Sequence, residues 1–219
     1  MPNDLHLIIG NKAYSSWSMR PWIAMKVAGL TFEETVICLG QDTTAAEIKK
    51  YSPSGKVPFL IHGGIKVWDS LAILEYLSEA FYDRPWWPTD PDARATARAV
   101  SAEMHSGFQG VRQNMPMNLR KSYPGRGRTP ESEADIARIT SLWRECRAKF
   151  GGGGPFLFGA FSNADAMYAP VVTRFKTYGV DLDPACRAYA DAVLGLPAMK
   201  QWCADAAAES WVVAKYELA

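Results

Sequence analysis

The sequence is poor in cysteine, and the cysteines it has are not grouped. The four lie at positions 38, 146, 186 and 203, and no Cys-x-x-Cys pair occurs. This spacing fits neither a zinc site nor a disulfide framework, so it favours reduced, buried thiols. We therefore expect no metal site.

Long apolar runs and an excess of one charge are also lacking. No segment approaches the length of a membrane-spanning helix, and the first ten residues, MPNDLHLIIG, have no basic leader before a long apolar run. Lysine and arginine total 24 against 23 acidic residues, which leaves no net field to attract nucleic acid or an anionic membrane. We expect a soluble, cytoplasmic protein without a signal peptide, with neither nucleic acid nor a membrane as partner.

The composition that is present is that of a globular protein. Hydrophobic residues make up 48% and charged residues 21% of 219 residues, enough to bury a core as one large domain or two small ones. The first eighty residues alternate short apolar runs with helical spacing. They predict strands at 5–9, 35–39, 59–61 and 65–68 and helices at 17–28 and 70–81, with an irregular helical stretch before the third strand. This order fits a small mixed sheet with helices on its faces.

The pattern changes after residue 82. Residues 83–91 contain three prolines, which predicts a stiff linker. Beyond it the spacing is helical, and no strand is expected. The predicted helices are 93–115, 131–150, 163–178, 184–194 and 197–208. The fold class is therefore α/β plus all-α, with an α/β domain at 1–82, a linker at 83–91 and an all-helical domain at 92–219.

Four short motifs point to a family. They are SSWSMR at 15–20, SGKVPFL at 54–60, Asp69-Ser70, and FSNADA at 161–166. In this order and spacing they resemble the glutathione transferase superfamily over essentially the whole chain. The resemblance implies a thioredoxin-like N-terminal domain that binds glutathione as co-substrate, followed by a helical bundle. It also implies a homodimer, with the N-terminal half of one subunit against the C-terminal half of the other.

The first motif is the candidate for thiol activation. The thiol of free glutathione has a pKa near 8.5, and lowering it by about two units requires roughly 2.7 kcal/mol of thiolate stabilisation. A hydroxyl group at a helix N-terminus can supply this. Resemblance to the zeta-class motif Ser-Ser-Cys-x-x-Arg implies that Ser15 activates the thiol and that Ser16 is a neighbouring donor. Two alternatives are that a serine only caps the helix, and that Tyr14 is the donor. Trp17 replaces the cysteine of that motif, which argues against cysteine-dependent side activities.

The next two motifs are candidates for binding glutathione. The resemblance implies a cis bond between Val57 and Pro58, which leaves the Val57 backbone free to pair with the cysteinyl unit like an added strand. A trans proline at a strand start is the alternative. Lys56 is the expected ligand of the glycine carboxylate, and Asp69 that of the γ-glutamyl amine. Ser70 is expected to cap the following helix, whose N-terminus suits the γ-glutamyl carboxylate.

The helical domain should supply the pocket for the second substrate. Met104 and Phe108 lie at helical spacing, and such a stripe packs in the core or borders the pocket. Resemblance to the zeta class implies that Gln113 contacts glutathione and that Arg174 receives a substrate carboxylate. A helix salt bridge is the alternative for Arg174. His105 is expected to be an ordinary helix histidine.

Two segments are assigned no chemistry. Ser162 and Asp165 have the spacing of a capping box, a folding feature. The basic segment 121–128, KSYPGRGR, is expected to be a solvated loop.

The predicted function is a glutathione transferase that adds the thiolate to a small electrophile, or a glutathione-dependent isomerase of maleyl-type diacids. The alternative is a non-catalytic binding protein on the same fold, comparable to stringent starvation protein. A thiol oxidoreductase is excluded because it needs a cysteine near residue 15, and Cys38, within a predicted strand, is the nearest.

Overall fold

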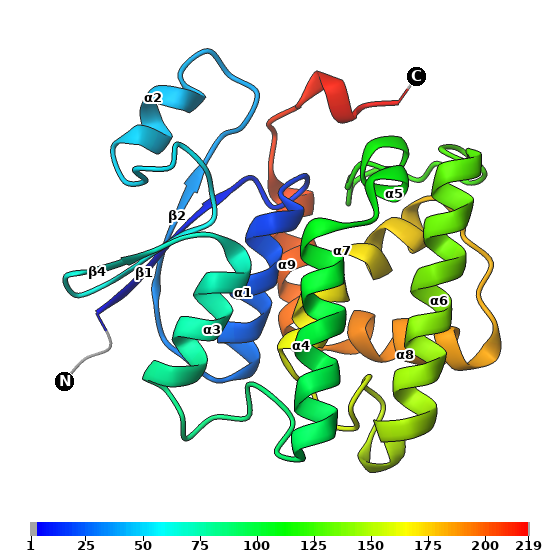
Figure 1. Ribbon diagram of the computed structural model, residues 1–219. Coiled ribbons are helices and arrows are strands. Elements are labelled where there is room, and N and C mark those ends of the chain that lie inside the picture. Colours follow the sequence, from blue (N-terminus) through cyan, green and yellow to red (C-terminus); the bar gives the residue numbers. More distant parts are fainter. Residues whose placement is uncertain (1–3, 219) are drawn as a thin grey trace.

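The computed structural model describes residues 4–218 and begins with a small mixed sheet (Figure 1). The strands are β1 (Leu5–Gly10), β2 (Glu33–Ile37), β3 (Phe59–His62) and β4 (Ile65–Val67). Their order is β2-β1-β3-β4, with β1 parallel to β2 and antiparallel to β3, and β3 antiparallel to β4. The helices of this region are α1 (Ser16–Val27), α2 (Thr44–Lys49) and α3 (Ser70–Ala80). The predicted thioredoxin-like fold is confirmed.

The position of each strand explains its composition. β1 lies between two neighbours, and Leu7, Ile8 and Ile9 are completely buried, so its apolar run is continuous rather than alternating. β4 lies at an edge of the sheet and is mostly exposed. The buried centre of the sheet therefore leads directly into the loop that precedes α1.

The rest of the chain is helical, as predicted. Beyond β4, residues 68–218 contain no further strand, only isolated bridges between residues 156 and 160. The helices are α4 (Pro91–Ser106), α5 (Gln109–Asn114), α6 (Pro130–Phe150), α7 (Asn163–Thr177), α8 (Pro184–Gly195) and α9 (Pro197–Ala208). Among residues 4–218, every helix is too short or too polar to span a bilayer.

The prediction of one helix over 93–115 was wrong. The structure divides this segment into α4 and α5, because Phe108 adopts a left-handed conformation with φ 59°. Arg112 donates to the carbonyl oxygens of Met104 and Gly107, which the end of α4 leaves without helical partners. The apolar spacing continues through the break, so periodicity alone did not reveal it.

The segment between the two regions is attached to both. Trp86 is buried, and its indole N–H donates to the carbonyl oxygen of Phe81 at 2.8 Å. Its own carbonyl oxygen accepts from the backbone N–H of Asn163, also at 2.8 Å. We propose residues 83–91 as the domain boundary, a mostly exposed segment that Trp86 anchors to both regions.

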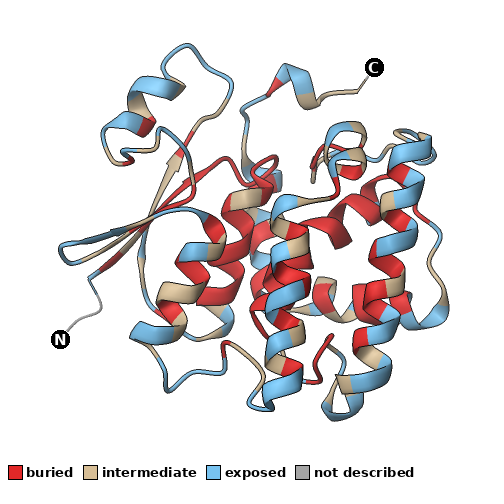
Figure 2. Cartoon of the chain, in the orientation of Figure 1, coloured by how far each residue is buried: buried red, intermediate tan, exposed pale blue. Residues whose placement is uncertain are grey.

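Helix α7 lies at the centre of the helical region. All of its residues are buried except Lys176, and it packs against α1, α4 and α8 (Figure 2). The expected capping box is present at its start, where the Asp165 carboxylate accepts from the Ser162 backbone N–H at 2.8 Å and from Leu157 N–H at 3.1 Å. Burial raises the pKa of Asp165 to about 6 against the opposing effect of these hydrogen bonds. This packing fixes α7 beside α1, where the first motif lies.

Candidate functional site

Ser15 and Ser16 lie side by side at the start of α1, and both are buried. Ser15 is the N-cap residue, but its hydroxyl caps no backbone N–H and instead donates to Ser18 Oγ at 2.7 Å. Ser16 Oγ accepts from Nη2 of Arg174 at 3.2 Å. The capping hydrogen bond considered as the alternative for Ser15 is absent from the described structure.

The Tyr14 hydroxyl forms hydrogen bonds with residues other than Ser15 and Ser16. It donates to the Glu217 carboxylate and accepts from Nη2 of Arg120 at 2.6 Å. Burial, and then the bond to Glu217, raise the pKa of Tyr14, while Arg120 opposes them. Tyr14 is thus fastened to the C-terminal segment of the chain.

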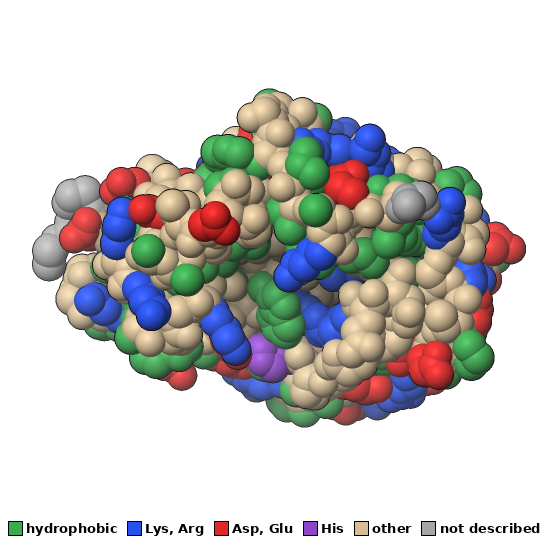
Figure 3. Space-filling view, turned by 90° about the horizontal axis from the view of Figure 1, so that it is seen from above, with side chains coloured by type: hydrophobic (Ala, Val, Ile, Leu, Met, Phe, Trp, Pro, Cys, Tyr) green, Lys and Arg blue, Asp and Glu red, His purple; other side chains and the backbone are tan. Residues whose placement is uncertain are grey.

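A cavity of about 810 Å³ lies beside the start of α1 and α3. The predicted glutathione ligands Lys56, Val57, Pro58, Asp69 and Ser70 all line it. The bond between Val57 and Pro58 is cis, as the resemblance implied. Figure 3 shows the molecule from above, where the surface is hollowed near its centre with Lys and Arg side chains around the hollow. The structure therefore brings the residues of two separate motifs to one cavity, which we call the glutathione cavity after the ligand that the resemblance implies.

One prediction about this cavity was wrong in detail. Asp69, not Ser70, caps α3: its Oδ1 accepts from the backbone N–H groups of Leu71 at 3.0 Å and Ala72 at 3.2 Å. The backbone of Asp69 is extended while Ser70 is already helical, so only Asp69 can turn its side chain towards the first free N–H groups. Ser70 is completely buried, and its Oγ lies 3.4 Å from Nη1 of Arg20.

His105 has a role that the sequence did not indicate. Its ring lines the glutathione cavity, and Nε2 lies 2.9 Å from Oδ2 of Asp69. The other ring nitrogen, Nδ1, is buried without a hydrogen-bond partner in the described part of the chain. Because His105 and Asp69 are far apart in the sequence, spacing carried no sign of this contact.

A second, smaller cavity of about 200 Å³ adjoins the first. Ser15, Ser16 and Arg174, three of the residues that the sequence selected, line it together with Arg112, which sequence analysis did not select. Arg174 is buried and donates from Nε to the carbonyl oxygen of Met115 at 2.9 Å. Burial, followed by the neighbouring Arg112, lowers the pKa of Arg174 to about 10. The helix salt bridge considered for Arg174 does not occur within residues 4–218. We call this second cavity the arginine cavity.

Three predicted residues are not brought to either cavity. Met104 and Phe108 are buried in the core, and Gln113 is exposed on α5. None of them is a lining residue of the glutathione cavity or the arginine cavity. The left-handed turn at Phe108 changes the direction of the chain, so the helical stripe expected to face the pocket does not reach it.

The C-terminal segment contributes instead. Tyr216 lines both cavities, and Lys215 lines the glutathione cavity. Nδ2 of Asn118 donates to Glu217 at 3.1 Å, and Arg120 donates to the carbonyl oxygens of Glu209 and Trp211. These hydrogen bonds hold the last described residues over the site.

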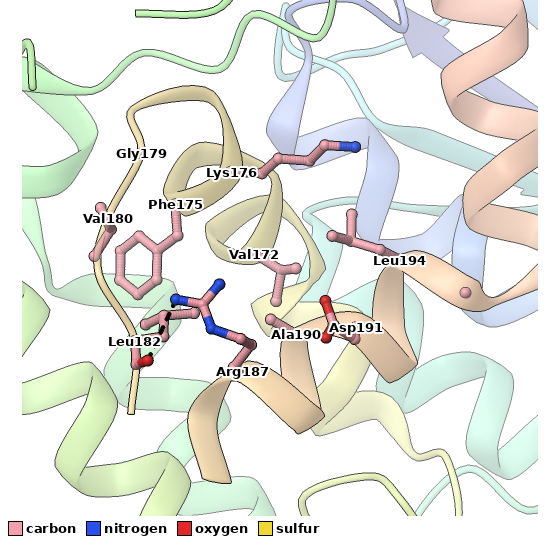
Figure 4. Close-up of a pocket in the computed structure, with 11 residues that line it drawn as sticks. Val172, Phe175, Lys176, Gly179, Val180, Leu182, Arg187, Ala190, Asp191 and Leu194 are labelled. Atoms are coloured by element: carbon pink, nitrogen blue, oxygen red, sulfur yellow. Dashed lines mark hydrogen bonds between the residues drawn. The ribbon is translucent and has the colours of Figure 1, made fainter. Parts of the chain in front are cut away.

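A further cavity of about 500 Å³ lies between α7 and α8, apart from these residues (Figure 4). Arg187 lies in it and donates to Asp181 and to the carbonyl oxygen of Leu182, both at 3.3 Å.

The basic loop 121–128 is docked rather than wholly solvated, since Tyr123 N–H donates to the carbonyl oxygen of Thr177 at 2.7 Å.

The four cysteines are free, and none lines the glutathione cavity or the arginine cavity. Burial raises the pKa of the half-buried Cys38 thiol. No cluster of His, Cys, Asp and Glu side chains able to hold a metal ion occurs within residues 4–218.

Comparison with known proteins identifies the family. The model of the glutathione S-transferase N-terminal domain matches residues 14–80, and that of the C-terminal domain matches residues 129–205. The chain is 30% identical over 171 residues to a probable maleylacetoacetate isomerase of Caenorhabditis elegans, covering 78% of this chain and 79% of that one. It is 33% identical over 185 residues to glutathione S-transferase Z2 of Arabidopsis thaliana, covering 79% and 80% respectively.

Solved structures share the fold of this chain. A holo structure of maleyl pyruvate isomerase, a bacterial zeta-class glutathione S-transferase, superposes with a TM-score of 0.72 at 25% identity, covering 94% of this chain and 100% of that chain. A glutathione transferase homologue from Burkholderia with bound glutathione has a TM-score of 0.69 at 22% identity and covers 93% and 97%. The chain therefore belongs to the glutathione S-transferase family, as its motifs implied.

Proposed function

We propose that this enzyme activates glutathione as a thiolate beside Ser15 and Ser16 and directs it at a small anionic electrophile, as a glutathione-dependent cis–trans isomerase of maleyl-type diacids. One observation carries the choice of an anion: the arginine cavity holds the guanidinium groups of Arg112 and Arg174, and no carboxylate side chain lines it. Asp135 partly balances the charge of the half-buried Arg112, whereas the buried Arg174 has no carboxylate partner within residues 4–218. A buried cation without a counter-ion favours a ligand that supplies the negative charge.

The glutathione cavity suits an extended tripeptide. The backbone of Val57 is available to pair with the cysteinyl unit, and Lys56 is exposed at the rim for the glycine carboxylate. At the other end, the N-terminus of α3 suits the γ-glutamyl carboxylate, and Asp69 Oδ2 suits the amine. Val57 lines both cavities, so a cysteinyl unit paired with it directs the thiol towards the arginine cavity.

The two serines are unequal donors to that thiol. In the described structure the Ser15 hydroxyl hydrogen is directed at Ser18, and it must rotate to reach a thiolate. Ser16 Oγ already accepts from Arg174, so its own hydrogen is free and its hydroxyl is polarised by a cation. Both serines stand at the positive end of α1. We infer that Ser15 and Ser16 stabilise the thiolate together, whereas Tyr14 is occupied by Glu217.

For this reaction the protein needs only to bind the two substrates and to stabilise negative charge. Bound glutathione supplies a thiolate that adds to the double bond of the electrophile and, in an isomerisation, leaves again after that bond has rotated. Arg112 and Arg174 would hold the carboxylates and stabilise negative charge on the substrate during the addition. No atom is gained or lost between the cis and trans isomers, so no further co-reactant is required.

Thiolate absorbance in the ultraviolet, recorded across pH with bound glutathione, tests the first step. We expect a bound thiol pKa about two units below its free value of about 8.5 in the wild-type protein, and a return towards that value in Ser15→Ala or Ser16→Ala. Ser78→Ala is the matched control, because Ser78 lies on α3 outside both cavities. Glutathione binding with an unshifted thiol pKa would contradict the proposed activation.

Activity on two electrophiles tests the second step. We expect turnover of a maleyl diacid to exceed conjugation of a neutral aryl halide. A preference for the aryl halide would instead indicate a conjugating transferase, and the absence of glutathione binding would support the non-catalytic alternative. We also expect a homodimer, which sedimentation velocity would detect as twice the mass of one chain.

A further inference from the structure

Trp17 lies at the junction of the two cavities. Its indole lines both the glutathione cavity of about 810 Å³ and the arginine cavity of about 200 Å³. Only three other residues are shared by these linings: Leu39, Val57 and Tyr216. A large, flat side chain at this place limits how far a ligand in the smaller cavity can extend.

Cations and a second aromatic ring hold the indole in place. The guanidinium carbon of Arg20 lies 4.2 Å from the ring centroid of Trp17, and that of Arg112 lies 4.7 Å from it. His105 meets the indole edge-on with ring centroids 5.2 Å apart. Cation–π contacts of this kind are strongest when the cation is removed from water, as Arg20 is here. These contacts therefore hold the Trp17 indole in one position between the two cavities.

Arg20 is left with unused hydrogen-bonding capacity. It is completely buried, yet its Nε and Nη2 atoms have no hydrogen-bond partner within residues 4–218. It touches Trp17 and Ser70, which line the glutathione cavity, but it lines neither cavity itself. A guanidinium with free donors thus lies within reach of the site, separated from it by other side chains.

We propose that Trp17 determines the length of the second substrate, by confining an anion to the arginine cavity beside Arg112 and Arg174 and by keeping it from Arg20. A short diacid fits the space that the indole leaves. A longer diacid requires the space that the indole occupies, and removal of the indole would offer its far carboxylate the free donors of Arg20. This inference rests on the proposed function, because it assumes an anionic second substrate.

Calorimetric titration of the glutathione-saturated protein with pimelate, suberate and sebacate, diacids of the length of a maleyl-type substrate and longer, tests the inference without requiring turnover. In the wild type we expect affinity to fall as the diacid lengthens. In Trp17→Ala we expect the ratio of sebacate to pimelate affinity to rise at least tenfold. Addition of Arg20→Met to Trp17→Ala should remove that rise, and Trp17→Phe, which keeps an aromatic ring over the cations, should give a smaller one.

Trp87→Phe is the matched control. Trp87 also stacks with an arginine, with Arg98 at 5.1 Å, but it lines neither cavity, so the ratio should stay at its wild-type value. Diacid binding with the same length preference in the wild type, Trp17→Ala and Trp17→Phe would overturn the role of Trp17 alone. Absence of diacid binding from every variant, while glutathione still binds, would overturn the anionic substrate and this role together.

Discussion

The glutathione cavity and the arginine cavity share a wall, yet they are built from the chain in different ways. Most of the first is lined by short consecutive segments, residues 54–58 and 68–70, which follow one another closely in the sequence. The second combines residues 14–17 with Arg112, Arg174 and Tyr216, which come from distant parts of the chain. The first would recognise its ligand through backbone groups together with Lys56 and Asp69, and the second through side chains from distant parts of the chain.

The two cavities would therefore differ in function: the first would bind glutathione, and the second would select the electrophile. A cavity made of local segments depends on turns and helix starts, which a short motif can specify. A cavity made of distant side chains can change its ligand through single substitutions without altering the fold. We therefore expect substitutions in the arginine cavity to change the choice of electrophile, and substitutions in the glutathione cavity to change the affinity for glutathione.

The largest effect should come from Arg174→Met. Removal of one partner of a buried charge pair costs about 2–5 kcal/mol, so we expect kcat/KM for an anionic diacid to fall at least ~30-fold. The value for a neutral aryl halide should fall much less, and steady-state kinetics on both substrates would measure the difference. Arg187→Met is the control, because Arg187 lies in the separate cavity between α7 and α8. Equal losses on both substrates would show that Arg174 acts only through the fold or the thiolate.

Asp165→Asn should affect stability. Helix α7 supplies Arg174 to the arginine cavity and no lining residue to the glutathione cavity. Because the pKa of Asp165 is raised from 3.8 to about 6, the folded state holds its proton more tightly than the unfolded state does. The contribution of this group to the unfolding free energy is thus present below about pH 4 and decreases, by about 2 kcal/mol, as the pH rises to about 6.

Urea unfolding across pH would measure this contribution as the difference between the wild type and Asp165→Asn, which should shrink over that range. Asp183→Asn is a control of opposite sign, since the Cys186 backbone N–H group lowers the pKa of Asp183 to about 2. For that variant the difference should grow as the pH rises from about 2 to 4. A pH-independent difference for Asp165→Asn would contradict the raised pKa.

The smallest of these effects is expected from Asp69→Asn. Asparagine keeps the cap of α3 but loses the charge that would pair with the γ-glutamyl amine, so glutathione affinity should fall about tenfold with little change in stability. Isothermal titration calorimetry with glutathione would measure it. Asp90→Asn serves as control, because Asp90 caps α4 in the same way outside both cavities. Unchanged affinity in Asp69→Asn would remove Asp69 from the glutathione site.

The difference between a cavity of local segments and a cavity of distant residues also explains how much of the site could be predicted from the sequence. The sheet, α3 and five lining residues of the glutathione cavity, within 56–58 and 69–70, could be selected from the sequence, because apolar runs and turn residues act locally. Arg112 and His105 were missed, since only the tertiary fold brings them beside Trp17. Met104 and Phe108 were placed at the pocket because the helical spacing runs through residues 107 and 108, where the helix in fact ends and the backbone turns at Phe108.

The hydrophobic core runs without interruption from the sheet region into the helical region. Trp22 on α1 meets Trp202 on α9 with ring centroids 5.1 Å apart, and the Trp202 indole N–H donates to the carbonyl oxygen of Lys12 at 3.0 Å. Chimaeras that join this N-terminal half to the C-terminal half of another family member would therefore need matched residues along α1. Recombination at the proline-rich segment alone would leave two incompatible surfaces, so the halves would have to be exchanged together with the residues that pack between them.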